Sequence, residues 1–167
     1  MAMEPNILRD RLDAVEARLG SVASADPPPG LTDPDPDGEE RWEAGQVWAH
    51  VAEFVPYWVS QAEMVIAAGS PEPVPFGRVK TDTARIEAIE RGRYEPATDV
   101  ISRVSASIEA VRVFTSELDS PEWEARGLHQ TRGVMTVREI FDRFVAAHLE
   151  EHVEQLEKLS LDHASAS

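Results

Sequence analysis

Hydrophobic residues recur every three or four positions in four long stretches of the chain, which is the spacing that places side chains on one face of an α-helix. These stretches cover residues 6–22, 41–69, 98–118 and 136–160. The last stretch shows the pattern most clearly, with one stripe formed by Val137, Ile140, Phe141, Phe144, Val145, His148, His152, Leu156 and Leu159. Four amphipathic helices joined by loops predict an all-α fold, a four-helix bundle.

Individual residues mark the expected ends of these helices. Thr136 followed by Glu139 is a capping box and predicts the start of the last helix. Thr98 or Asp99 is the candidate N-cap of the third helix, and Gly69 is expected to end the second. Pro56 lies inside the second helix, where it should kink the helix or disturb its hydrogen bonds.

Stretches rich in proline and glycine separate the helices. Residues 23–40 and 70–82 contain several prolines and predict connecting loops, and residues 120–135 are also expected to form a loop. A short extra helix is predicted at residues 83–92, where Gly92 stops it. Strand signals are weak throughout, so no β-sheet is expected.

Length and charge restrict the class of protein. The chain has 167 residues, 31 acidic and 16 basic side chains, and a formal net charge of −15. We expect one domain over residues 1–160 and a frayed C-terminal tail, residues 161–167, with too few apolar side chains to pack. An acidic surface repels nucleic acid and anionic membranes. Without a signal pattern or an apolar run of 18 residues, the chain is expected to be soluble and cytoplasmic.

The absence of cysteine limits the chemistry of the chain itself. It excludes disulfide bonds, cysteine-bound zinc and a protein thiol that could act as a nucleophile.

Three of the five histidines lie on apolar helical stripes. His148 and His152 are four residues apart on the last helix, which places their side chains on one face. His50 lies on the stripe of the second helix, whereas His129 falls in a predicted loop and His163 in the tail. Facing helices of a bundle can bring such side chains to one metal ion, so the pattern predicts a site formed by His50, His148 and His152.

A metal is favoured over a buried hydrogen-bond network because each buried imidazole without a partner costs on the order of 1–3 kcal/mol. A single histidine on an apolar stripe is more often a hydrogen-bonded core residue, but here three coincide. Three neutral imidazoles suit Zn²⁺, Ni²⁺, Fe²⁺, Cu²⁺ or Mn²⁺. Three protein ligands leave coordination positions open, which is the pattern of catalytic rather than structural sites.

The chain resembles the DinB/YfiT-like superfamily of four-helix metalloproteins. The resemblance rests on RWEAGQVWAHVAEF, on MTVREIFDRFVAAHLEEHVEQLEKL, and on the roughly one hundred residues between His50 and the pair His148 and His152. It covers residues 5–160 and implies that these three histidines bind the metal. The mycothiol-dependent maleylpyruvate isomerases of the superfamily have a glutamate where this chain has His148, and usually a second domain, which argues against that reaction here.

The resemblance also implies a chemistry. Members use a divalent metal to activate a low-molecular-weight thiol such as mycothiol, bacillithiol or glutathione, and others resemble metal-dependent hydrolases. We therefore expect an enzyme, a thiol S-transferase or a hydrolase that acts on a small molecule. A non-catalytic metal-binding stress protein is the alternative. The oligomeric state stays open, with a homodimer as one candidate.

Other residues are weaker candidates. Glu53 and Tyr57 follow His50 on the same helix and are candidate catalytic or supporting residues, although a solvated carboxylate and a packed ring are the simpler interpretations. Arg78 and Arg93 fall in loops, where either could bind a carboxylate of the cofactor or substrate. Glu151 is expected to be solvated. Trp42 and Trp48 are expected to pack at the end of the bundle.

Overall fold

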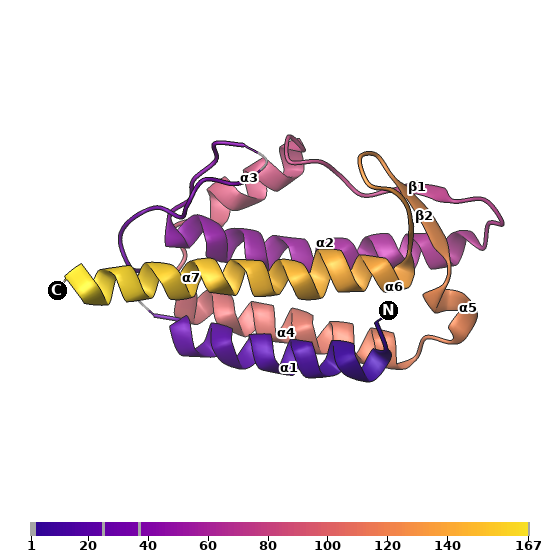
Figure 1. Ribbon diagram of the computed structural model, residues 1–167, viewed down its shortest axis with the longest axis horizontal. Helices are drawn as coiled ribbons and strands as arrows, with labels where there is room; N and C mark the ends of the chain where they lie inside the picture. Colours follow the sequence, from indigo (N-terminus) through magenta and orange to yellow (C-terminus); the bar gives the residue numbers. More distant parts are fainter. Residues whose placement is uncertain (1–2, 25, 37, 167) are drawn as a thin grey trace.

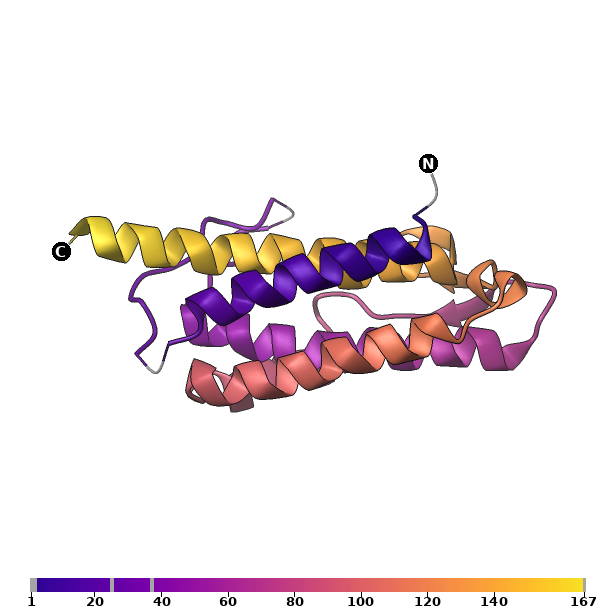
Figure 2. The same ribbon diagram turned by 90° about the horizontal axis from the view of Figure 1, so that it is seen from below.

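The computed structural model describes residues 3–24, 26–36 and 38–166. Its four long helices are α1 (Pro5–Val22), α2 (Ala44–Ala68), α4 (Ala97–Ser116) and α7 (Ala147–Ala166). Figures 1 and 2 show them running alongside one another, with the end of α7 projecting beyond the other helices on one side. Helices α1 and α2 each contact both α4 and α7, so the predicted four-helix bundle is confirmed.

The core consists of the apolar stripes that defined the helices in the sequence. On α1 the stripe Leu8, Leu12, Val15 and Leu19 is fully buried, and on α4 the stripe Val100, Val104, Ile108 and Val111 is buried as well. Each fully buried Leu, Ile or Val side chain contributes about 1.5–3 kcal/mol relative to exposure. No helix in the described part of the chain is long and apolar enough to cross a membrane.

The helix ends agree with most of the predicted signals. Thr136 and Glu139 form the expected capping box, since the backbone N–H of each donates to the side chain of the other. Gly69 ends α2 with a left-handed φ of 53°. Helix α2 continues without interruption across Pro56. The prediction of Thr98 or Asp99 as N-cap was wrong, because α4 begins one residue after Pro96, whose ring already fixes a suitable φ.

A small sheet corrects the prediction that residues 70–82 and 120–135 are only loops. Strand β1 (Val74–Phe76) pairs in parallel with β2 (Arg126–His129), which pairs in antiparallel fashion with β3 (Gly133–Thr136). The single turn of α5 (Ser120–Trp123) precedes β2. Strands of three or four residues are too short to show an alternating pattern, so their pairing was invisible in the sequence. The short helix α3 (Thr83–Gly92) lies where it was predicted.

The last predicted helix is not a regular α-helix throughout. It begins as α6 (Val137–Ile140), continues as the π-helical turn η1 (Phe141–Ala146), and only then becomes α7. A π-helical turn has a wider backbone than an α-helix and is often found at functional sites. Here it ends two residues before His148, the first histidine of α7.

Helix α7 continues into the segment that was expected to fray. It extends to Ala166, and residues 161–165 are exposed on it. Adding residues to a helix that is already formed requires no new nucleation.

Candidate metal centre

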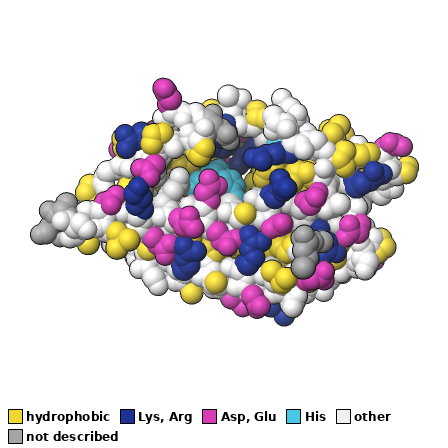
Figure 3. Space-filling view, viewed as in Figure 1, with side chains coloured by type: hydrophobic (Ala, Val, Ile, Leu, Met, Phe, Trp, Pro, Cys, Tyr) yellow, Lys and Arg dark blue, Asp and Glu magenta, His cyan; other side chains and the backbone are white. Residues whose placement is uncertain are grey.

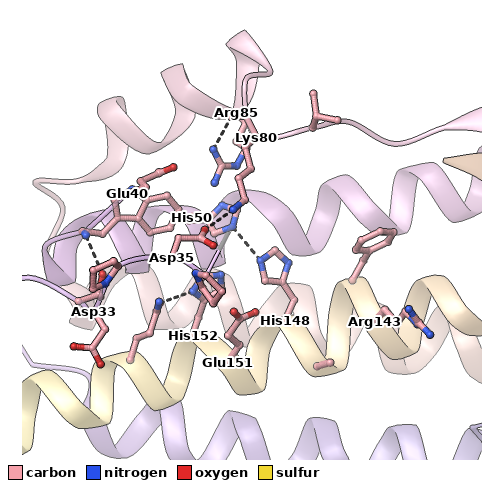
Figure 4. A pocket seen from close by; sticks show the side chains of 18 of the residues that line it. Asp33, Asp35, Glu40, His50, Lys80, Arg85, Arg143, His148, Glu151 and His152 are labelled. Atoms are coloured by element: carbon pink, nitrogen blue, oxygen red, sulfur yellow. Dashed lines mark hydrogen bonds and ion pairs between the residues drawn. The ribbon is translucent and has the colours of Figure 1, made fainter. Parts of the chain in front are cut away.

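Helices α2 and α7 bring three imidazoles together at the middle of the bundle. His50 lies on α2, and His148 and His152 lie one turn apart on α7. Nε2 of His50 is 3.3 Å from Nε2 of His148, and one ring nitrogen from each of the three histidines lies within 4.8 Å of the others. His50 is 2% exposed and His152 is 6% exposed. Figure 4 shows the three rings converging from the two helices.

The outer nitrogens of two of these rings are held by side chains three residues further along the same helix. Nδ1 of His50 is 2.7 Å from Oε2 of Glu53, and Nδ1 of His152 is 2.7 Å from Oε1 of Gln155. Both oxygens are acceptors, so each Nδ1 carries the proton and each Nε2 keeps its lone pair. This is how histidines that bind metals are usually oriented by their neighbours.

Two ring nitrogens of the cluster lack a protein partner within the described part of the chain. Nε2 of His152 and Nδ1 of His148 are buried without a hydrogen-bond partner of normal geometry among the described residues. Burial lowers the pKa of His148, and an interaction with the backbone of Phe144 acts in the opposite direction. If His148 is protonated at Nδ1, its Nε2 presents a lone pair to the two lone pairs of His50 and His152. A single metal ion would accept all three lone pairs at once.

The spacing fits a transition metal ion. Two nitrogens bound to Zn²⁺ at about 2.0–2.1 Å in a tetrahedral arrangement are about 3.3–3.4 Å apart. The distance between Nε2 of His50 and Nε2 of His148 is 3.3 Å. The donor set of three imidazoles, with no carboxylate in the group, also suits a borderline transition metal better than Mg²⁺ or Ca²⁺.

Burial keeps these imidazoles neutral. Burial, more than the neighbouring histidines and arginines, lowers the pKa of His50 and His148 well below the usual value. Burial also lowers the pKa of His152, to about 4, although the hydrogen bond to Gln155 acts in the opposite direction. Neutral imidazole is the form that binds metals, so the cluster is ready to bind one at neutral pH.

Glu53, a weak candidate in the sequence, occupies a central position. Its carboxylate binds Nδ1 of His50 on one side and Nη2 of Arg78 on the other, at 2.7 Å from Oε2. The guanidinium of Arg78 lies 3.9 Å from the ring centroid of Tyr57. Burial raises the pKa of Glu53, and Arg78 opposes this change. Tyr57, Arg78 and Glu53 therefore form a stack that orients His50.

The structure does not bring Arg93 to this site. Its guanidinium pairs with Glu43 at 2.9 Å and with Glu90 at 3.0 Å, away from the residues that line the pocket. Both arginines that were candidates for binding a ligand carboxylate thus bind carboxylates of the chain itself.

The histidines lie at the floor of a pocket of about 940 Å³. Its walls come from the loop before α2, from the loop between β1 and α3, from the turn between β2 and β3, and from α7. Figure 3 shows histidine side chains at the bottom of a hollow that is bordered by charged residues of both signs. Two ion pairs connect its walls, Lys80 with Asp35 at 2.5 Å and Lys158 with Asp33 at 2.6 Å. Glu151 also lines the pocket and is exposed, as predicted.

Several residues of the pocket were missed in the sequence, among them Gln155, which supports His152, and three residues from outside α7. Trp42 was predicted only to pack at the end of the bundle, but its ring lies 5.1 Å from that of His50 and 6.0 Å from that of His152. His129 was placed in a loop; it is 5% exposed, and its Nε2 lies 3.2 Å from the carbonyl of Arg78. Arg85 was read only as part of a short helix. None of these three carries a local signal, because each reaches the site through contacts that are distant in sequence.

A four-helix bundle with three neutral imidazoles at the floor of an open pocket defines a helical protein with a candidate mononuclear metal centre. The chain belongs to the DinB superfamily, whose family model matches residues 8–156. A search of curated protein sequences gives no match.

Solved structures share the fold at low sequence identity. YfiT from Bacillus subtilis, described as a probable metal-dependent hydrolase with an unusual four-helix bundle topology, is 13% identical, with a TM-score of 0.71 over 95% of this chain and 86% of that one. A mycothiol-dependent maleylpyruvate isomerase is 13% identical, with a TM-score of 0.67 over 91% of this chain and 58% of its own. An uncharacterized protein from Clostridium difficile 630 is 13% identical, with a TM-score of 0.64 over 96% and 97% of the two chains.

Proposed function

We propose that this protein is an enzyme that binds one divalent transition metal through His50, His148 and His152 and joins a low-molecular-weight thiol to a small electrophile. The observation that carries the proposal is the set of three imidazoles at the floor of an open pocket, with one ring nitrogen of each within 4.8 Å of the others. A structural site would be closed by a fourth protein ligand, whereas this group contains only three among the described residues.

The metal would supply acidity: a thiol or water in an open coordination position would lose its proton near neutral pH. The remaining functions fall to side chains of this chain. Glu53 and Gln155 hold the Nδ1 protons of His50 and His152, so the Nε2 lone pairs stay directed into the pocket. Trp42 packs beside the cluster on the pocket side, with its ring 6.0 Å from that of His152, and the core residue Phe54 stacks on His148 at 4.2 Å.

A thiol is favoured over water for two reasons. The chain has no cysteine, so a sulfur nucleophile must arrive with a small molecule. A pocket of about 940 Å³ is far larger than an attacking water needs and has room for a thiol cofactor together with its electrophile. The isomerase with this fold is described as mycothiol-dependent.

Hydrolysis is the second candidate, and the similarity of fold to YfiT, described as a probable metal-dependent hydrolase, supports it. In that case the position of the thiol would be taken by water. A non-catalytic metal-binding role fits the open pocket less well, because storage or structural binding does not require a cavity above the ion.

Elemental mass spectrometry on untagged protein tests the metal. We expect about one equivalent in the wild type and little in His148→Ala, while His163→Ala, which changes an exposed histidine of α7 outside the cluster, keeps full occupancy. Metal-loaded protein is then assayed with mycothiol, bacillithiol and glutathione against a chromogenic electrophile, and without thiol against chromogenic esters. Thiol-dependent turnover that is lost in His148→Ala supports the proposal. Turnover of esters alone favours hydrolysis, and the absence of metal from the wild type contradicts both.

A further inference from the structure

Arg85 is a buried cation in the pocket. It lies on α3 and is 8% exposed, a degree of burial that arginine rarely reaches without a carboxylate partner. Its Nη1 donates one hydrogen bond, to the carbonyl of Lys80 at 2.9 Å. This hydrogen bond uses Nη1 and leaves the N–H groups of Nε and Nη2 available to other acceptors.

Within the described part of the chain, Arg85 forms no ion pair with a carboxylate. Arg78, which lines the same pocket, binds Glu53, and Lys80 binds Asp35. Arg132 and Arg143 also line the pocket but are exposed, so water can satisfy them. Arg85 differs from all of these, because it is buried and no carboxylate of the described residues lies within ion-pairing distance of it. Burial lowers its pKa, and the more distant carboxylates of Glu40, Glu53 and Asp35 oppose this change only in part, whereas directly bound carboxylates raise the pKa of Arg11 and Arg112.

The guanidinium of Arg85 faces the histidine cluster. It lies 5.4 Å from the ring centroid of Trp42, the same ring that packs against His50 and His152. Its positive charge is near enough to contribute to the low pKa of each of the three imidazoles, in addition to their burial. Figure 4 shows Arg85 reaching from α3 toward His50, across the space above the cluster.

We infer that Arg85 binds a carboxylate group of the small molecule that reacts at the histidine cluster. The inference deepens the proposed function and rests on it for the reaction itself. The ligand therefore carries two features: a thiol or electrophilic centre over the imidazoles, and a carboxylate against the guanidinium, with its non-reacting part along the Trp42 ring. The fork of N–H donors matches the two oxygens of a planar carboxylate.

The charges around the pocket favour a carboxylate over a phosphate as the group bound at Arg85. Glu40, Glu151 and Asp162 also line the pocket, together with Asp33 and Asp35, which are paired with Lys158 and Lys80. These acids would repel a phosphate group, which carries two charges, more strongly than a carboxylate group, which carries one. One carboxylate group would neutralise the single charge of the Arg85 guanidinium.

The first experiment uses metal-free protein, so that it does not depend on the metal. Intrinsic tryptophan fluorescence, to which Trp42 contributes, measures the affinity for succinate and for the neutral analogue succinamide. We expect wild type to bind succinate at least tenfold more tightly than succinamide, and Arg85→Gln to lose this preference. The matched control is Arg143→Gln, which removes the same charge from an exposed position of the same pocket and should keep the preference.

Far-UV circular dichroism shows whether Arg85→Gln is folded. A second variant, Arg85→Lys, keeps the inference testable if it is not. Arg85→Lys keeps the charge but cannot present two parallel donors, so it should bind succinate several-fold more weakly, whereas Arg143→Lys should not. An unchanged preference in the Arg85 variants, or a loss in the Arg143 variants, would overturn the assignment.

The second experiment separates this inference from the proposed function. Cobalt-loaded protein is titrated with 3-mercaptopropionate and with 2-mercaptoethanol, and the sulfur-to-cobalt absorption band is recorded. Tighter binding of the mercapto acid, abolished in Arg85→Gln, places the carboxylate and the thiol in one ligand. If neither thiol changes the spectrum while the succinate preference persists, Arg85 binds carboxylates and the thiol proposal fails. If both thiols bind equally in all variants and succinate shows no preference, the thiol site stands and the Arg85 inference fails.

Discussion

Acidification should destabilise the metal-free protein through its buried histidines. Burial lowers the pKa of His152 to about 4, from an ordinary value near 6.5 in the unfolded chain. Between these two values the unfolded chain binds a proton that the folded protein does not, so stability is complete above pH 6.5 and is lost as the pH falls toward 4. A difference of about 2.5 pKa units corresponds to on the order of 3 kcal/mol.

Total stability of a domain is about 5–15 kcal/mol, so this loss is large. His50 and His148 shift in the same direction and add to it. Protonation of the 31 acidic side chains has its own effect, since it reduces the repulsion of a chain with net charge −15. The contribution of the histidine must therefore be isolated by comparing variants.

The assay is urea unfolding of metal-free protein at several pH values between 4.5 and 7.5. His152→Gln removes the titrating group and should lose less stability on acidification than wild type, by on the order of 2–3 kcal/mol. His163→Gln, which changes an exposed histidine outside the cluster, should follow wild type. Zinc should stabilise wild type at neutral pH and keep this effect until the pH approaches 4, where protons begin to compete for the nitrogen of His152. An identical pH dependence for His152→Gln and wild type would refute the reasoning.

Three further substitutions test separate parts of the structure. Glu53→Gln should weaken metal binding about 10–100-fold, because the amide orients His50 less strongly than a carboxylate; competition with a chromophoric chelator measures this, and an unchanged affinity would contradict the role of Glu53. Thr136→Ala should cost about 1 kcal/mol in urea unfolding through loss of the capping box, with unchanged metal content. Gly77→Ala should cost about 1–3 kcal/mol, since its φ is 86° and a Cβ would lie 2.5 Å from Cδ2 of His129; equal stability would mean that the loop relaxes freely.

The sequence predicted the bundle because helical periodicity is repeated many times along each long helix. Each of the four stripes contains enough buried positions to exclude other patterns, and the capping box at Thr136 located one helix start directly. Strands β1 to β3 could not be predicted in this manner, because each has at most four residues, and β1 pairs with a segment about fifty residues away in the sequence. The π-helical turn η1 could not be predicted either, because its apolar residues have the same spacing as those of an α-helix.

In the candidate site, too, the residues that could be predicted are those placed by helical spacing. The three histidines and their supports Glu53 and Gln155 follow helical spacing, and two of these contacts are between residues three apart. Arg85 and His129 carry no such signal, because their roles depend on where α3 and the sheet pack against the bundle. The interpretation of Arg78 and Arg93 as arginines that bind a ligand was reasonable by composition, but only the structure shows which guanidinium lacks a carboxylate partner.

This division has a consequence for how the protein could change its ligand. The imidazoles belong to α2 and α7, which are fixed by the buried core, whereas Arg85 and the loops around it lie outside the four-helix core. Substitutions on α3 or in the β1–α3 loop should therefore alter ligand preference while leaving metal affinity unchanged, except at Arg78, which holds Glu53 and through it His50. Arg78 is thus the residue at which ligand selection and metal binding should be coupled. Arg78→Lys should lower metal affinity and Arg85→Lys should not, a contrast that one chelator competition on both variants would measure.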